Sequence, residues 1–151
     1  MVISYKFSIA KGKITIENTM LTFNDLVRRG FIMIKGIGID MIELDRIKKA
    51  IQRNASFAER ILTESELSTY HLLNGHRSVE FLAGRFAAKE AYAKARGTGI
   101  GKLSWQDICV QKSTEGAPYI ETKEENEIVH ISISHTKQHA VAQIIIECSS
   151  S

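Results

Sequence analysis

The 151-residue sequence has little cysteine, little net charge and no long apolar run, and each shortage excludes a class of protein. Its two cysteines, Cys109 and Cys148, lack metal-binding spacing and predict reduced thiols in a cytosolic protein. A formal charge of +3 is too small to indicate a nucleic-acid partner. No apolar run reaches membrane-spanning length, and the N-terminus lacks the apolar core of a secretory signal. We therefore expect a soluble, cytoplasmic protein with neither a nucleic-acid nor a membrane partner.

The length suits a single domain, and the apolar and charged fractions are those of an ordinary globular protein. Residues 1–32 differ in pattern from the remainder of the chain. Residues 2–9 and 14–16 have strand character on either side of a turn at 11–13, which predicts a hairpin. A short helix is expected over residues 24–29.

The next part of the chain combines one strand with helical patterns. An apolar run at 34–39 predicts a buried strand, and Ile47 and Ile51 recur with helical spacing in the segment that follows. Thr63 and Glu66 have the spacing of a capping box, so a second helix is expected to begin there.

The longest helix is predicted over residues 79–96, with Ser78 as its N-cap and Gly97 as the left-handed residue after its last turn. Gly84 inside this helix costs about 1 kcal/mol relative to alanine, which indicates tight packing at that point. Four strands are expected toward the C-terminus, over 107–112, 119–122, 128–134 and 140–147. Helices first and a strand meander second predict an α+β fold.

Charged residues of the long helix form the first candidate site. Phe86, Glu90 and Lys94 are spaced four residues apart on one helix face, among alanines that indicate close packing. Asp40 ends the apolar strand, 50 residues before Glu90. Two carboxylates suit a divalent cation, and Lys89 and Lys94 suit a phosphorylated substrate. The alternatives are a surface Glu–Lys pair worth about 0.2–0.5 kcal/mol, and an Asp40 that only caps the following helix.

Three other patterns carry weaker signals. Gly36 and Gly38 start a dinucleotide-binding fingerprint, but Met41 stands at the third glycine position. The glycine-rich run at 97–101 follows a helix instead of opening one, so it predicts a helix stop and a tight turn. The histidines near the C-terminus lack the spacing of a zinc site.

Taken together, several motifs closely resemble the holo-[acyl-carrier-protein] synthase family, the small bacterial type of the 4′-phosphopantetheinyl transferase superfamily. They are GIGID at 36–40, FLAGRFAAKEA at 81–91, Lys94, GTGIG at 97–101 and ISISHT at 131–136. The resemblance implies helices packed on an antiparallel sheet, in a homotrimer with active sites between subunits. It also implies transfer of 4′-phosphopantetheine from coenzyme A to a serine of apo acyl carrier protein, with release of adenosine 3′,5′-bisphosphate, in support of fatty acid biosynthesis.

The resemblance also implies a set of catalytic residues. Asp40 and Glu90 match the family's Mg²⁺ ligands, and Lys94 matches a residue that pairs with the pyrophosphate of coenzyme A. Mg²⁺ suits this set because it keeps several waters and takes other oxygens from substrate phosphates. The serine proton passes either to Glu90 or to a metal-bound water. Longer, two-lobed relatives use a third acid two residues after the aspartate, where this chain has Ile42.

The family's segment for the adenosine and 3′-phosphate end of coenzyme A also has counterparts in this chain. The implied contacts are Ser134, His135 and Thr136, with Arg85 and Gly97 as weaker candidates. In the two-lobed relatives the Ser-His and Gly-Ile-Asp segments come from different lobes. By analogy, His135 is expected to reach Asp40 of a neighbouring subunit.

Arg46 and Arg53 lie on the basic face of the helix after the first strand. The pattern alone allows a solvated face or a docking site for an acidic protein, and the resemblance implies docking of the carrier protein. A second class of function is a nucleotide-binding or regulatory module that keeps the fold without the chemistry.

Members of the family that this chain resembles usually begin, at this size, at a methionine just before the Gly-Ile-Gly strand, which is Met33 in this chain. We therefore expect a transferase domain over 33–148 and a short tail at 149–151. Residues 1–32 are interpreted either as an extension from an upstream start codon or as a hairpin packed on the trimer. An intact N-terminus, measured by mass spectrometry on protein from the native gene, would rule out the internal start.

Overall fold

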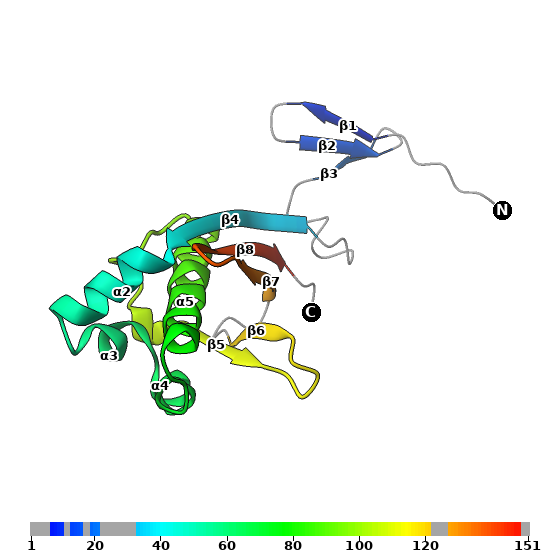
Figure 1. Ribbon diagram of the computed structural model, residues 1–151. Helices are drawn as coiled ribbons and strands as arrows, with labels where there is room; N and C mark the ends of the chain where they lie inside the picture. The colour runs from blue at the N-terminus through cyan, green and yellow to red at the C-terminus, as the bar shows by residue number, and fades with distance from the viewer. Residues whose placement is uncertain (1–6, 11–12, 17–18, 22–32, 122–126, 149–151) are drawn as a thin grey trace.

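The computed structural model describes residues 7–10, 13–16, 19–21, 33–121 and 127–148 (Figure 1). In its first part, β1 (Phe7–Ala10) pairs with β2 (Lys13–Ile16), and β2 pairs with β3 (Thr19–Leu21), all antiparallel. The pairing of the first two segments that the sequence predicts is thus confirmed, and β3 is an addition to it. The helix expected over 24–29 lies outside the described residues.

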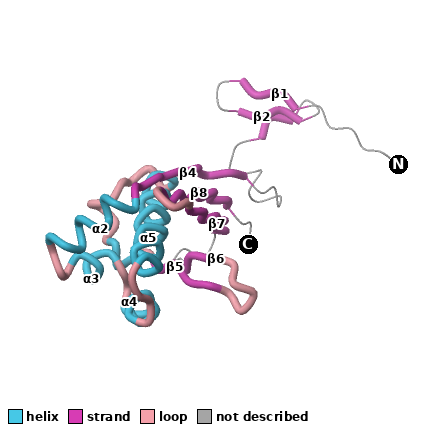
Figure 2. Tube along the Cα trace, viewed as in Figure 1, coloured by secondary structure: helices cyan, strands magenta, loops and turns pink. Residues whose placement is uncertain are grey.

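The remaining elements follow the order that the sequence predicts: one strand, then helices, then strands. The α+β class is thus confirmed (Figure 2). They are β4 (Met33–Glu43), α2 (Leu44–Arg53), α3 (Phe57–Ile61), α4 (Glu64–His71), α5 (His76–Ala95), the 3₁₀ helix η1 (Trp105–Asp107), β5 (Cys109–Lys112), β6 (Pro118–Glu121), β7 (Glu127–His135) and β8 (His139–Cys148). Among the described residues, no helix is long and apolar enough to cross a membrane.

The main sheet has the strand order β4-β8-β7, and both pairings are antiparallel. The expectation of one meander made by the last four strands is wrong, because β5 and β6 form a separate pair. The third place in the main sheet is taken by β4, whose Asp40 stands opposite Ala142 of β8. Ala142 in turn stands opposite Ile133 of β7, so one row of side chains crosses the sheet.

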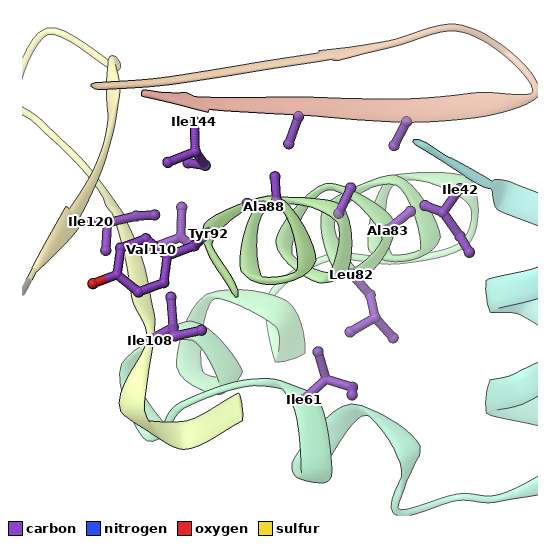
Figure 3. Close-up of a cluster of buried hydrophobic side chains, with 14 of the residues drawn as sticks. Ile42, Ile61, Leu82, Ala83, Ala88, Tyr92, Ile108, Val110, Ile120 and Ile144 are labelled. Atoms are coloured by element: carbon purple, nitrogen blue, oxygen red, sulfur yellow. The ribbon is translucent and has the colours of Figure 1, made fainter. Parts of the chain in front are cut away.

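Helix α5 runs between the main sheet on one side and α2, α3 and α4 on the other (Figure 1). Ile144 of β8 packs toward Ala88 on the sheet side of α5, while Leu82 meets Ile61 of α3 on the opposite side (Figure 3). Because α5 has neighbours on both sides, much of its surface is buried, including all but one of its alanines completely. A helix in this position can present charged side chains to a site only at specific points along its surface.

Strand β4 touches the backbone of α5 through two glycines. A Cβ atom added to Gly38 would lie 1.9 Å from the carbonyl oxygen of Ala91, and one added to Gly36 would lie 2.0 Å from that of Ala95. Any side chain at either position would therefore push the strand off the helix. The two glycines thus allow close strand–helix contact, a known use of glycine within a strand, and do not form a nucleotide loop.

The ends of the helices agree with the sequence in part. The amide of Thr63 donates to the carboxylate of Glu66 at 2.8 Å, so the predicted capping box is present. The predicted start of α5 is wrong, because the helix begins at His76 after Gly75, and the hydroxyl of Ser78 donates to the Gly75 carbonyl. Gly97 has the expected left-handed φ of 69°.

Candidate active site

A carboxylate of β4 and an ammonium of α5 meet where the strand crosses the helix. The Nζ of Lys94 donates to Oδ1 of Asp40 at 2.7 Å and to the carbonyl oxygen of Ile39 at 3.0 Å. Asp40 faces α5 because it is in register with Ala142, which is buried on that side of the sheet. The alternative role of Asp40 as a helix cap is wrong, since the residue lies inside β4 and the N-cap position of α2 is Glu43.

Glu90 is half-buried on α5, one turn before Lys94. Burial raises the pKa of the Glu90 carboxyl, the negative charge of Asp40 raises it further, and the positive charge of Lys94 opposes both effects. Because Lys94 contacts Asp40 and Glu90 lies one turn before Lys94 on α5, the two carboxyls lie near each other. The structure thus brings together Asp40, Glu90 and Lys94, the three residues that the sequence predicts as catalytic.

A pocket of about 540 Å³ lies beside α5, between α4 and the strands β5, β6 and β7. Arg85 reaches it from α5, with 7% of its surface exposed and its guanidinium 4.4 Å from the centre of the Phe81 ring. Within the described part of the chain, the buried Nε of Arg85 has no hydrogen-bond partner. Arg77, Lys112 and His135 add further positive or titratable groups to the lining. Such a pocket suits an anionic ligand.

His135 lies at this pocket and not at the carboxylate pair of its own chain. Its Nδ1 is 3.4 Å from Oε1 of Glu80, a contact that the sequence did not suggest. His135 ends β7 and Asp40 belongs to β4, with β8 between the two strands. Within one chain the structure therefore keeps the predicted coenzyme A segment apart from Asp40.

The remaining predicted coenzyme A contacts are exposed. Ser134 lies near the end of β7, and Gly97 follows the last turn of α5. The hydroxyl oxygen of Thr136 accepts hydrogen bonds from the amides of Gln138 and His139, at 3.2 and 3.1 Å, which hold the turn before β8. The Thr136 side chain thus has a structural role in this turn.

Arg46 and Arg53 are exposed on α2 and lie seven residues apart, which puts them on the same side of the helix. Near them, Lys49 pairs with Asp45 at 2.6 Å. Both arginines are accessible to a partner, as a docking face requires.

Comparison with known proteins shows which superfamily the chain belongs to. The sequence profile of the 4′-phosphopantetheinyl transferase superfamily matches residues 36–145, and the chain belongs to that superfamily. Within it, the chain is 55% identical over 117 residues to a holo-[acyl-carrier-protein] synthase of Listeria innocua, covering 76% of this chain and 99% of the relative. It is 58% identical over 119 residues to a protein of the same name from Bacillus cereus, covering 78% of this chain and 99% of the relative.

Solved structures of holo-[acyl-carrier-protein] synthases resemble this chain as well. The chain matches a holo-(acyl-carrier-protein) synthase from Bacillus anthracis in complex with CoA (3′,5′-ADP), with a TM-score of 0.73 and 56% identity over 78% of this chain and 99% of the other. It also matches the Helicobacter pylori holo-[acyl-carrier-protein] synthase in complex with coenzyme A, with a TM-score of 0.65 and 36% identity over 73% and 98%. The profile match begins within β4 and ends within β8.

Proposed function

We propose that Asp40, Glu90 and Lys94 carry out phosphopantetheinyl transfer in this chain. The chain transfers the 4′-phosphopantetheine group of coenzyme A to a serine of apo acyl carrier protein and releases adenosine 3′,5′-bisphosphate. The observation that carries this proposal is the meeting of Lys94 with Asp40 beside Glu90, in a chain that shares its superfamily's fold. We assign the transferase domain to residues 33–148, and its reaction to the cytoplasm and to fatty acid synthesis.

The carboxylate pair fits a magnesium ion. In the described part of the chain, no three His, Cys, Asp or Glu side chains gather as a complete metal cage. Two neighbouring carboxylates suit Mg²⁺, which binds through one or two carboxylates and completes its shell with water and substrate phosphates. We propose that Asp40 and Glu90 hold the ion. When bound, Mg²⁺ would neutralise charge on the pyrophosphate of coenzyme A and make the transferred phosphorus easier to attack.

Lys94 and Glu90 supply the remaining functional groups. Half of the Lys94 side chain is exposed, so its ammonium can turn from Asp40 toward an arriving phosphate. Glu90 has a raised pKa, which brings its carboxylate closer to the proton affinity of an efficient general base at neutral pH. We therefore propose Glu90 as the acceptor of the proton that the carrier serine loses.

The pocket lined by Arg85 and His135 is our candidate for the adenosine and 3′-phosphate end of coenzyme A. We keep Ser134, Thr136 and Gly97, which lie outside its lining, as further candidate contacts of coenzyme A. Because this pocket is separate from Asp40 within one chain, a complete site needs two subunits. An apolar face supports such an assembly: Ile37, Ile39 and Met41 of β4 are 59%, 59% and 65% exposed on the side of the sheet away from α5. We propose a homotrimer that buries this face, with active sites between subunits.

We assign docking of the acidic carrier protein to Arg46 and Arg53 on α2. The experiment that tests the whole proposal incubates the chain with apo acyl carrier protein, coenzyme A and Mg²⁺. Transfer adds the phosphopantetheine arm, about 340 Da, to the carrier serine. A carrier of unchanged mass, together with measurable binding of coenzyme A, would favour the nucleotide-binding module without chemistry.

A further inference from the structure

Lys89, the residue before Glu90, is fully buried and has 0% of its surface exposed. Its ammonium donates to three acceptors from three different elements. They are the carbonyl oxygen of Ile61 at 2.6 Å, Oε2 of Glu66 at 2.6 Å and the carbonyl oxygen of Trp105 at 3.0 Å. An ammonium has three N–H donors, so all three have acceptors. The expectation that Lys89 contacts a phosphorylated substrate is therefore wrong.

The carboxylate of Glu66 connects Lys89 to the rest of the molecule. Only 3% of Glu66 is exposed, and its Oε2 also accepts from the amide of Thr63 at 2.8 Å. Its Oε1 accepts from the amide of Val110 in β5 at 3.0 Å and lies 3.7 Å from Nε of Arg85. One buried ion pair thus ties α5 to the start of α4 and to β5, and through Lys89 to the end of α3 and to η1.

This network holds α5 on the side away from β4. On the other side, the backbone contacts of Gly36 and Gly38 hold the helix at Ala95 and Ala91. Glu90 lies between these two sets of contacts, about 100° around the helix from Lys89. A rotation of α5 about its axis would break the Lys89 hydrogen bonds and would also move Glu90 and Lys94 relative to Asp40.

We propose that Lys89 is a positioning residue for the transfer reaction: its buried pair with Glu66 fixes the rotation and height of α5 and so sets Glu90 and Lys94 opposite Asp40. This inference rests on the proposed function of those three residues. A buried pair contributes little net stability compared with apolar residues of similar size, but it allows few arrangements when every donor and acceptor is paired. Here the arrangement it specifies includes the catalytic face of α5.

The test compares Lys89→Met with the double variant Lys89→Met/Glu66→Met, which removes both charges of the Lys89–Glu66 pair and leaves Arg85 without its neighbouring carboxylate. Lys102→Met, at an exposed loop lysine, is the matched control. The fluorescence of Trp105, the only tryptophan in the chain, reports whether η1 stays docked, and thermal unfolding reports the folded fraction. Transfer is measured as kcat per folded molecule, together with the Mg²⁺ concentration that gives half-maximal rate.

We expect Lys89→Met to lower kcat on the order of 100-fold, because small misplacements of catalytic groups have effects of that size. We expect the half-maximal Mg²⁺ concentration to rise as well. The double variant should regain part of the thermal stability, because Lys89→Met alone leaves the buried Glu66 carboxylate without its closest ammonium, but it should not regain kcat. If kcat returns together with stability, or if Lys89→Met transfers at the wild-type rate per folded molecule, Lys89 supports the fold only. An inactive wild-type protein would instead count against the proposed function itself.

Discussion

At the scale of single residues, the site depends on charges brought together at the edge of a packed core. Lys94 neutralises Asp40 at 2.7 Å, while Glu90 stays half-buried with a raised pKa. The sequence predicted the catalytic role of these three residues because they lie in recognisable motifs. It could not predict the role of Lys89, because lysines are seldom buried and the partners of this one lie 16 to 28 residues away along the chain.

Glu90 should make the stability of the metal-free protein depend on pH. Its folded-state pKa is raised above 4.5, chiefly by burial, so folding favours the protonated carboxyl. That contribution is fully present below the unfolded-state pKa and is lost as the pH rises through the raised pKa. The neutral variant Glu90→Gln keeps it. In urea unfolding with a chelator present, the free energy of unfolding of the variant should therefore increase relative to that of the wild type between pH 4.5 and neutrality. A difference between the two proteins that stays constant over this range would contradict this prediction.

At the scale of elements, the contact between β4 and α5 positions the site. Sequence patterns predicted the long helix, its neighbouring helix and most of the strands, because each has a clear period or cap. They missed α3, a five-residue helix. The side-chain amide of Gln106 in η1 donates to the Glu59 carbonyl of this helix and to the carbonyl of Leu62, which follows it. They also placed the end of β4 too early, because its last residues extend only through pairing with β8.

Gly38→Ala should separate the strand from the helix. Its Cβ would lie 1.9 Å from a backbone oxygen that cannot move aside, so we expect a loss of about 3 kcal/mol or more in the free energy of unfolding. Gly84→Ala is the matched control. Its Cβ would meet only the tip of the Ile133 side chain, at 3.3 Å, and the helix gains about 1 kcal/mol in propensity. Equal stability of the two variants in urea titrations would contradict the claim that Gly38 allows the close contact between β4 and α5.

Arg46→Glu on α2 should weaken recognition of the carrier protein without changing the chemistry. Reversing one exposed charge opposite an acidic partner should raise KM for the carrier about tenfold and leave kcat unchanged. Lys102→Glu, outside α2, controls for the change in net charge. Steady-state kinetics over a range of carrier concentrations measures both constants, and an unaltered KM would remove Arg46 from the docking face.

At the scale of the whole molecule, the outer side of β4 is apolar and exposed, while the inner face of the main sheet packs on α5. The sequence could not separate these two faces. Ile37 and Ile39 are as apolar as the core residues Ile42 and Ile144, and only the register of β4 shows which of them point outward.

Ile37→Asp should break the assembly that we propose. A carboxylate placed in a buried, apolar subunit interface has no partner, so the trimer should dissociate to single chains and lose transfer activity. Leu72→Asp, at an 82% exposed position after α4, should keep both the assembly and the activity. Light scattering after size-exclusion chromatography measures the mass, and a trimeric Ile37→Asp protein would rule out this face as the interface.

The most direct test of the site is transfer of the phosphopantetheine arm by proteins that differ in one carboxylate. Wild type, Glu90→Gln, Asp40→Asn and the exposed-carboxylate control Glu115→Gln are each incubated with apo acyl carrier protein, coenzyme A and Mg²⁺, and the carrier is weighed by mass spectrometry over time. Wild type and Glu115→Gln should convert the carrier at equal rates. The two site variants should be slower by on the order of 100-fold or more. Conversion by Glu90→Gln or Asp40→Asn at the wild-type rate would contradict the site described here.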